Sequence, residues 1–222
     1  MSKKVLVTGA SRGIGLAIAQ LYRQHGYEVF TPTKQELDLS SVKSIEKYIA
    51  NSQNFYPDIL INNAAINKIS KIETLTVEEW QQVITVNLTA PFLLTQYALP
   101  YMISQQWGRI VNISSIYSLI SRIGRVAYST SKAGLNALTR ATALECAPSH
   151  ILVNSVCPGF VETDLTRQNN NSDQIAAICQ QIPLERLAKP HEIADFIFFL
   201  GSDKNSYITG QEMIVDGGFI CQ

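Results

Sequence analysis

The 222-residue sequence has no surplus of charge, because 18 lysine and arginine residues balance 18 aspartate and glutamate residues. Nucleic-acid binding normally needs a basic surplus, so this balance argues against DNA or RNA as a partner. Long apolar runs are missing too, and the first, residues 5–7, is too short for a secretory signal or a membrane span. We therefore expect a cytoplasmic protein without a nucleic-acid or membrane partner.

Cysteine is scarce, with four residues that form no CxxC pair and have no histidine at metal-ligand spacing. In a chain of this length without a signal peptide, such cysteines are more often buried or incidental thiols than disulfides. The sequence therefore predicts no metal site.

Short apolar runs alternate with longer helical patterns along the chain. We expect strands near residues 5–8, 29–31, 37–39, 59–62, 110–113, 152–156 and 213–215, and helices over 13–25, 42–51, 78–86, 90–106, 127–146, 174–181 and 193–200. Apolar runs without alternation are typical of parallel strands that are covered on both faces. The pattern predicts one α/β domain over residues 1–222, a doubly wound Rossmann fold with helices on both faces of a parallel sheet.

The polar stretch over residues 168–173 interrupts this pattern. It is either a disordered surface loop or a mobile lid over a pocket. Its place after the carboxyl end of a strand favours the lid.

A glycine-rich turn, TGASRGIG over residues 8–15, follows the first expected strand and opens the first helix. Glycines there allow a tight turn in which backbone N–H groups approach a pyrophosphate at the helix N-terminus. A purely structural turn is the alternative, but the strand-before and helix-after context favours nucleotide binding. The residues assigned to the phosphates are Gly9, Ser11, Arg12, Gly13, Ile14 and Gly15.

The end of the second expected strand lacks the acidic residue that usually holds the ribose 2′-hydroxyl of NAD. Two cations accompany this missing carboxylate: Arg12 lies in the glycine-rich turn itself, and Lys34 follows the second strand. They suit a 2′-phosphate, so NADP(H) is favoured and NAD(H) stays possible, unless both are ordinary exposed charges.

Tyr128 and Lys132 are separated by four residues and therefore lie on one face of a helix. A lysine ammonium beside a phenol favours the phenolate, which would lower the tyrosine pKa toward the working pH of a general acid–base. Ser115 follows a strand, and its hydroxyl can hydrogen-bond a substrate oxygen. A chance Tyr–Lys pair is the alternative, which the combination with Ser115 and the glycine-rich turn disfavours.

Taken together, these motifs resemble the short-chain dehydrogenase/reductase family over essentially the whole chain. The signatures are residues 8–15, Asp38-Leu39, residues 62–65, Asn87, Ser115, Tyr128 with Lys132, Pro158-Gly159 and residues 216–218. The resemblance implies a catalytic tetrad of Asn87, Ser115, Tyr128 and Lys132. In it Ser115 orients the carbonyl, Tyr128 passes the proton, Lys132 lowers the tyrosine pKa and holds the nicotinamide ribose, and Asn87 anchors a proton-relaying water.

The resemblance also implies contacts with the rest of the cofactor. Asp38 contacts the adenine amino group, Asn63 and Ala64 flank the adenosine ribose, and Val161 and Thr163 bind the carboxamide. Leu39, Pro158 and Gly159 complete the expected cofactor site. The chain departs from the family between its second strand and Asp38, where a helix is missing and the adenine end is more open.

Within the family, residues 158–165, 184–194 and 208–210 resemble those of β-ketoacyl-carrier-protein reductases most. We therefore expect an NADP(H)-dependent oxidoreductase that acts on a carbonyl or secondary alcohol, with a 3-oxoacyl thioester as one substrate. Arg167 fits docking of an acidic carrier protein, whereas Arg122 and Arg125 could serve a negatively charged substrate; simple solubilising charges are the alternative. A sugar or polyol dehydrogenase is the second hypothesis. A redox-sensing regulator is the third, but it would have little need of the whole tetrad.

Two of the expected helices, residues 90–106 and 127–146, carry apolar residues on more than one face. Such residues exceed the needs of one core and indicate a packing partner. The family resemblance implies that this partner is another copy of the chain, in a homodimer or homotetramer.

Overall fold

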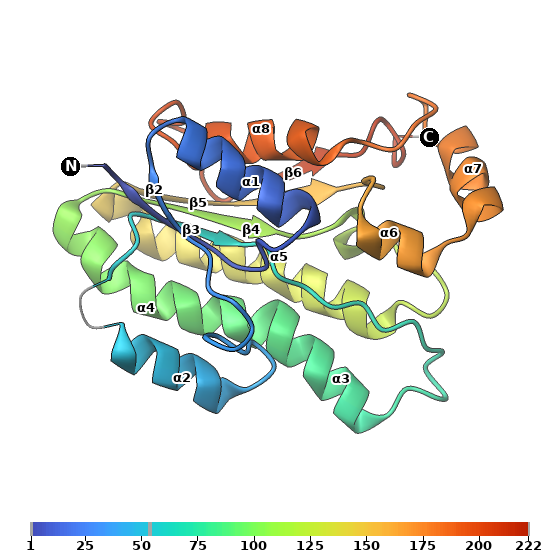
Figure 1. Cartoon of the computed structure of the whole chain (residues 1–222), viewed down its shortest axis with the longest axis horizontal. Coiled ribbons are helices and arrows are strands. Elements are labelled where there is room, and N and C mark those ends of the chain that lie inside the picture. Colours follow the sequence, from blue (N-terminus) through green and yellow to red (C-terminus); the bar gives the residue numbers. More distant parts are fainter. Residues whose placement is uncertain (1, 53–54, 222) are drawn as a thin grey trace.

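The computed structural model describes residues 2–52 and 55–221, and its centre is a parallel sheet (Figure 1). The strands are β1 (Lys4–Val7), β2 (Glu28–Phe30), β3 (Ile59–Asn62), β4 (Gly108–Ile113), β5 (Ile151–Pro158) and β6 (Glu212–Val215). Their order is β2-β1-β3-β4-β5-β6, and every neighbouring pair is parallel. The order reverses between β1 and β3, which is where doubly wound sheets bind ligands. The predicted Rossmann fold is confirmed.

Helices cover both faces of this sheet. They are α1 (Gly13–Gln24), α2 (Val42–Asn51), α3 (Val77–Ile84), α4 (Ala90–Gln105), α5 (Val126–Cys146), α6 (Asp164–Asn169), α7 (Ser172–Gln180) and α8 (Pro190–Leu200), with a π-helical turn at Thr85–Thr89 and 3₁₀ turns at Ile116–Ser118 and Ala147–Ser149. In Figure 1, α1 and α8 lie above the sheet, and α2 to α5 lie below it. Within the described ranges, no helix has both the length and the apolar character that crossing a bilayer requires.

Two apolar layers separate the sheet from these helices. Val5 and Val7 of β1 face the layer that contains Ile18 of α1, whereas Leu6 faces the layer that contains Leu94 of α4. Successive side chains of a strand point to opposite faces, so both sets are buried. This two-sided burial is why the strands read as uninterrupted apolar runs.

The strand expected over residues 37–39 does not form, so that prediction is wrong. The carboxylate of Asp38 accepts hydrogen bonds from the backbone N–H and the hydroxyl of Ser40, at 3.0 and 2.7 Å. This local turn occupies the backbone that a strand would use. Leu37 still packs in the core, and the chain runs from β2 directly to α2, which is the shortening that the sequence indicated.

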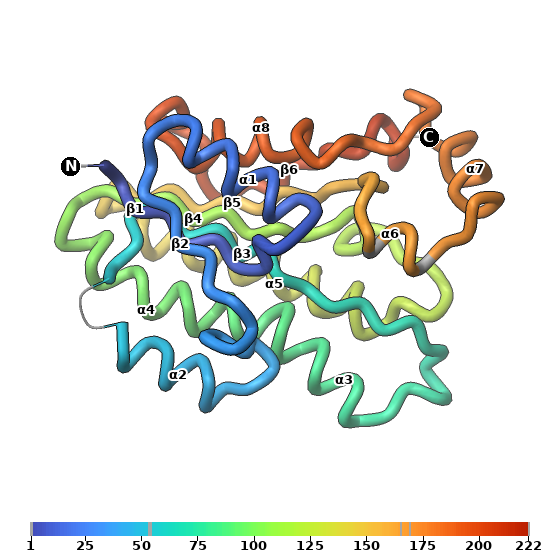
Figure 2. The backbone as a smooth tube through the Cα atoms, in the orientation of Figure 1, coloured from blue at the N-terminus to red at the C-terminus, as the bar shows by residue number. Residues whose placement is uncertain are grey.

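The polar stretch over residues 168–173 joins the end of α6 to the start of α7. Asn171 caps α7, because its side chain accepts from the Gln174 backbone N–H while the Gln174 side chain accepts from the Asn171 backbone. A disordered loop is therefore the wrong interpretation of this stretch. The tube trace in Figure 2 shows α6 and α7 beyond the carboxyl end of β5, where a lid would lie. Closure of such a lid remains a prediction.

Candidate active site

A cleft of about 320 Å³ opens at the carboxyl edge of the sheet. It joins the turn after β1, the ends of β3 and β4, the start of α5 and the segment after β5. Its lining residues are Gly9, Ser11, Arg12, Gly13, Ile14, Gly15, Asn63, Ala64, Ala65, Ile113, Ser114, Ser115, Tyr128, Lys132, Pro158, Gly159, Val161, Thr163, Asp164 and Thr166. Most residues that the sequence assigned to the site are therefore brought together.

The turn after β1 is packed so tightly that no side chain fits at Gly9 or Gly15. Gly9 has a φ of +66°, and a Cβ there would lie 2.8 Å from the Cα of Ala64. A Cβ on Gly15 would lie 2.3 Å from the carbonyl oxygen of Gly9. The Asn63 side chain closes the same turn by donating to the carbonyl oxygens of Thr8 and Gly9, at 2.9 and 3.1 Å. The tight turn is thus held against the end of β3.

The N-terminus of α1 faces this cleft without a side-chain cap. Its N-cap residue Arg12 makes no capping hydrogen bond, and the first turn holds no acidic residue. Free N–H groups and the positive end of the helix dipole favour an anion there. The arrangement fits the pyrophosphate of a dinucleotide. The exposed Arg12 guanidinium lies 3.9 Å from the carboxylate of Asp164, on the other side of the cleft.

Tyr128 and Lys132 enter the cleft from α5, and Ser115 enters from the end of β4. The Lys132 ammonium is buried and donates to the carbonyl oxygen of Ile113 at 2.6 Å. It lies 5.7 Å from the centre of the Tyr128 ring. Ser115 begins the 3₁₀ turn after β4, where its hydroxyl accepts from the N–H of Tyr117 at 3.2 Å.

Burial is the main cause of the pKa shifts of Tyr128 and Lys132. It raises the pKa of Tyr128 above its ordinary value, although a hydrogen bond with Ser115 and the charge of Arg125 both act to lower it. Burial also lowers the pKa of Lys132 to about 8. Desolvation outweighs the favourable contacts of Tyr128, and the Lys132 ammonium is hydrogen-bonded to Ile113. The expected effect of Lys132 on the tyrosine pKa stays a prediction.

Asn87 lies behind the cleft, in the π-helical turn between α3 and α4. It is fully buried. Its amide accepts from the N–H of Ile66 and donates to the carbonyl of the same residue, both at 2.9 Å, and donates to Ser131 at 3.0 Å. Asn87 therefore braces the segment after β3 against α5. A role in anchoring a water stays a prediction.

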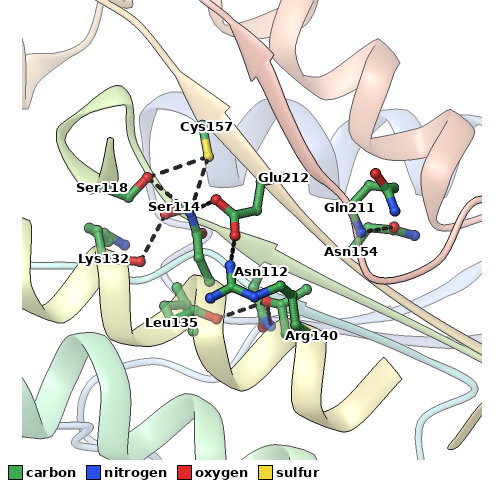
Figure 3. Close-up of polar contacts among 12 residues, drawn as sticks. Asn112, Ser114, Ser118, Lys132, Leu135, Arg140, Asn154, Cys157, Gln211 and Glu212 are labelled. Atoms are coloured by element: carbon green, nitrogen blue, oxygen red, sulfur yellow. Dashed lines mark hydrogen bonds and ion pairs between the residues drawn. The ribbon is translucent and has the colours of Figure 1, made fainter. Parts of the chain in front are cut away.

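The part of α5 that follows Lys132 is held against β6 and the turn after β4 by polar contacts that the sequence did not indicate (Figure 3). The Asn136 amide donates to Glu212 of β6 at 2.6 Å and to the Ser118 hydroxyl at 3.0 Å. Arg140, one turn further, forms an ion pair with the same carboxylate. Nearer the cleft, the Ser114 hydroxyl donates to the carbonyl of Lys132 at 3.2 Å. These contacts hold the helix that presents Tyr128.

Three residues assigned to the cofactor do not line the cleft. Lys34 is exposed in the turn after β2, the Asp38 carboxylate is bonded to Ser40, and Leu39 packs against the core layer beside α4. Conversely, five lining residues were not expected from the sequence, namely Ala65, Ile113, Ser114, Asp164 and Thr166. Each lies within three residues of a predicted one along the sequence, so widening every motif by three positions would have found them.

Within residues 2–52 and 55–221, no cluster of three His, Cys, Asp or Glu side chains could hold a metal ion. The cysteines are free thiols: Cys146 and Cys157 are buried, whereas Cys221 is exposed.

Known proteins match the chain closely in sequence. The family model described as enoyl-(acyl carrier protein) reductase matches residues 32–220. A 3-oxoacyl-[acyl-carrier-protein] reductase from Aquifex aeolicus is 41% identical, with 97% of this chain and 96% of that protein covered. The enzyme of the same name from Thermotoga maritima is 37% identical, with 98% of each covered.

Solved structures match along nearly the full length as well. A 4-hydroxyisoleucine dehydrogenase mutant, complexed with NADH and succinate, superposes with a TM-score of 0.94 at 30% identity and 99% coverage of both chains. The aldohexose dehydrogenase of Thermoplasma acidophilum, in ligand-free form, gives a TM-score of 0.93 at 33% identity, covering 100% of this chain and 95% of that one. The chain therefore belongs to the short-chain dehydrogenase/reductase family of oxidoreductases.

Proposed function

We propose that this protein transfers a hydride between NADP(H) and the carbonyl carbon of a 3-oxoacyl compound, with Tyr128 as the proton donor. One observation carries the proposal: a single cleft joins an uncapped helix N-terminus, suited to a pyrophosphate, to Ser115, Tyr128 and Lys132. A bound nicotinamide supplies the hydride. The protein supplies orientation, a proton and stabilisation of the developing oxyanion.

Each residue around the reacting carbon has one task in this proposal. Ser115 donates a hydrogen bond to the carbonyl oxygen, and Tyr128 passes its phenolic proton to the same oxygen as the alcohol forms. Lys132 holds the nicotinamide ribose, and Val161 and Thr163 hold the carboxamide. In the reverse direction, the Tyr128 phenolate takes the proton of the alcohol.

The remaining cofactor contacts follow the walls of the cleft. The glycine-rich turn binds the pyrophosphate, Asn63 and Ala64 flank the adenosine ribose, and Pro158 with Gly159 closes the nicotinamide end. Asp38 and Leu39 are assigned to the adenine, beyond the described cleft lining.

The preference for NADP(H) rests on two cations. Arg12 lies at the mouth of the cleft and Lys34 is exposed in the turn after β2. The solved relative with NADH makes NAD(H) the competing assignment. Fluorescence titrations with NADPH and NADH decide between them, and tighter binding of NADH would refute the assignment to Arg12 and Lys34.

The names of the curated relatives favour a 3-oxoacyl group carried on a protein. Arg167 is the proposed docking cation, and its side chain is exposed but already paired with Glu162 at 2.6 Å. The aldohexose dehydrogenase among the solved relatives supports a sugar or polyol alcohol as the second candidate. The panel of substrates to be tested should therefore contain 3-oxoacyl thioesters as well as sugar and polyol alcohols.

We also propose a homodimer or homotetramer built on α4 and α5. Phe92 and Ile103 of α4 and Leu144 of α5 are exposed apolar side chains, and Leu144 has 81% of its surface exposed. Sedimentation of the protein with and without Leu144→Glu tests this, because a monomeric wild type would contradict the proposal.

The substitution Tyr128→Phe tests the function. The probe is the N-acetylcysteamine thioester of 3-oxobutanoate with NADPH, and Tyr207→Phe, at a residue with 95% exposure, is the control. We expect Tyr128→Phe to keep NADPH affinity but to lose turnover by about 10²–10⁴-fold. Undiminished turnover would remove the mechanism. NADPH binding without turnover of any panel substrate would favour a redox-sensing regulator instead.

A further inference from the structure

Arg125 is a buried cation for which the described residues provide no anion. It directly precedes α5, and only 8% of its surface is exposed. Among the described residues its guanidinium takes part in no salt bridge, and its Nη1 is buried without a hydrogen-bond partner. An unpaired buried charge of this kind is costly, because its lost hydration is not replaced.

A second buried arginine shows what a structural role looks like in the same protein. Arg109 is 5% exposed. Its Nη1 donates to the carbonyl oxygens of Gly108 and His150, and its Nη2 donates to that of Asn205. Those contacts tie β4 to neighbouring loops. The Nε of Arg109 is also buried without a partner. The guanidinium of Arg125, however, makes no hydrogen bond at all among the described residues, so a purely structural role leaves its donors unexplained.

The surroundings of Arg125 place it beside the proton-transfer group. Its Cζ lies 5.7 Å from the centre of the Tyr117 ring, and that ring lies 6.3 Å from the ring of Tyr128. Arg125 also precedes Tyr128 by three positions, which is about one helical turn. Its charge acts to lower the pKa of the Tyr128 phenol, although burial raises that pKa overall.

The ring of Tyr117 does not replace an anion. A cation over an aromatic face gains roughly 0.5–2 kcal/mol, but the ring offers no lone pair to the N–H groups of the guanidinium. The planar fork of an arginine matches a carboxylate, which can accept two parallel hydrogen bonds. A carboxylate is therefore the partner whose charge and shape fit the vacant donors.

We propose that Arg125 binds a carboxylate of the substrate, and that the preferred substrate is a short oxo acid or hydroxy acid. This inference rests on the proposed function, which places the substrate carbonyl at Ser115 and Tyr128, and Tyr128 is three positions along the chain from Arg125. Among 3-oxoacyl compounds it favours the free acid over the carrier-bound thioester, and so it competes with the carrier-protein assignment made above. A neutral ester or thioester of the same acid lacks the group that Arg125 binds.

The test compares a negatively charged probe with a neutral probe that carries the same ketone. The probes are 3-oxobutanoate and its methyl ester, assayed with NADPH for the wild type, Arg125→Gln, Arg125→Lys and Arg122→Gln. Arg122 is the matched control, because it is an exposed arginine in the same segment. We expect Arg125→Gln to lose about 10–100-fold in kcat/KM for the acid, mainly through KM. Turnover of the ester is expected to stay within twofold, and Arg125→Lys is expected to recover part of the loss.

Two results overturn the inference while the proposed function stands. An equal loss for acid and ester, with a shifted pH profile, shows that Arg125 acts on Tyr128 instead of on the substrate. An unchanged Arg125→Gln enzyme shows that no anion binds there.

If the wild type reduces neither probe, the proposed substrate class fails, and binding is measured separately. Thermal stabilisation by butanoate, with butanamide as the neutral control, is then compared in the same variants. Stabilisation by butanoate that disappears in Arg125→Gln but persists in Arg122→Gln supports the carboxylate site. Equal stabilisation of both variants overturns it.

Discussion

The ammonium nitrogen of Lys132 lies 2.6 Å from the carbonyl oxygen of Ile113, the last residue of β4. The Ser114 hydroxyl returns a hydrogen bond to the carbonyl of Lys132, at 3.2 Å. These two contacts link α5 to the carboxyl end of the central strand. They give Lys132 a structural task beside the one proposed for it in holding the cofactor.

This relationship makes stability depend on pH in a defined direction. The pKa of Lys132 is lowered to about 8 from 10.5, so between these values the unfolded chain holds more protons than the folded protein. The free energy of unfolding therefore rises with pH across that interval, and this stabilising contribution is absent below pH 8. Across this pH interval, we expect the free energy of unfolding of the wild type to rise by about 1–3 kcal/mol more than that of Lys132→Met. Urea unfolding at several pH values measures the difference.

The control for that measurement is Lys43→Met, at an exposed position of α2. Its pH dependence should parallel that of the wild type. A Lys132→Met curve that also runs parallel would show that Lys132 keeps an ordinary pKa in the folded protein.

Ser115→Ala should shift the titration of Tyr128 upward. The hydrogen bond between these residues lowers the tyrosine pKa, because it stabilises the phenolate. Its loss raises the pKa further, so alcohol oxidation should reach its plateau at a higher pH than in the wild type. The pH profile of kcat measures this, with the exposed residue Ser121 replaced by Ala as the control. An unshifted profile would contradict the assignment of Tyr128 as the base.

Gly15→Ala should destabilise the fold. The added Cβ would lie 2.3 Å from the carbonyl oxygen of Gly9 and 2.4 Å from the Asn63 amide nitrogen, where backbone must move. We expect a loss of about 1–3 kcal/mol in urea unfolding. The matched control is Gly134→Ala in α5, whose Cβ would meet the flexible end of Leu88 at 2.8 Å. A similar effect of both substitutions would refute the close approach at Gly15.

Tyr22→Phe should leave stability unchanged or increase it by about 1 kcal/mol. The Tyr22 hydroxyl is buried and has no hydrogen-bond partner among the described residues, so its removal relieves a desolvation cost. Tyr97→Phe is the opposite case, because its hydroxyl donates to the carbonyl oxygens of Ser52 and Phe55. We expect that substitution to cost about 1 kcal/mol. Calorimetry of both variants checks the difference in sign.

The fold class and most of the cleft lining could be read from the residues because their signals are local. Residues 8–15 carry a strand, a turn and a helix start within one stretch. Tyr128 and Lys132 need only the helical repeat to share a face. The carboxyl ends of parallel strands meet at one edge, so Ser115 and Asn63 follow from the strand pattern alone.

Predictions from the local sequence were wrong or incomplete where a long-range or competing interaction determined the structure. At residues 37–39 a three-residue apolar pattern indicated a strand, but the Asp38 side chain forms a turn with Ser40. For Asn87, the motif indicated a site residue but not its pairing with Ile66 and Ser131. Those partners come from other parts of the chain.

The order of residues by itself determined that a glycine-rich turn, a serine, a tyrosine and a lysine meet at one edge of a parallel sheet. Only the tertiary structure decided the electrostatics there, because desolvation depends on what covers a group. Burial raises the pKa of Tyr128 and lowers that of Lys132. Burial also distinguishes the unpaired Arg125 from the exposed Arg122, although the sequence presents both as arginines in one short segment.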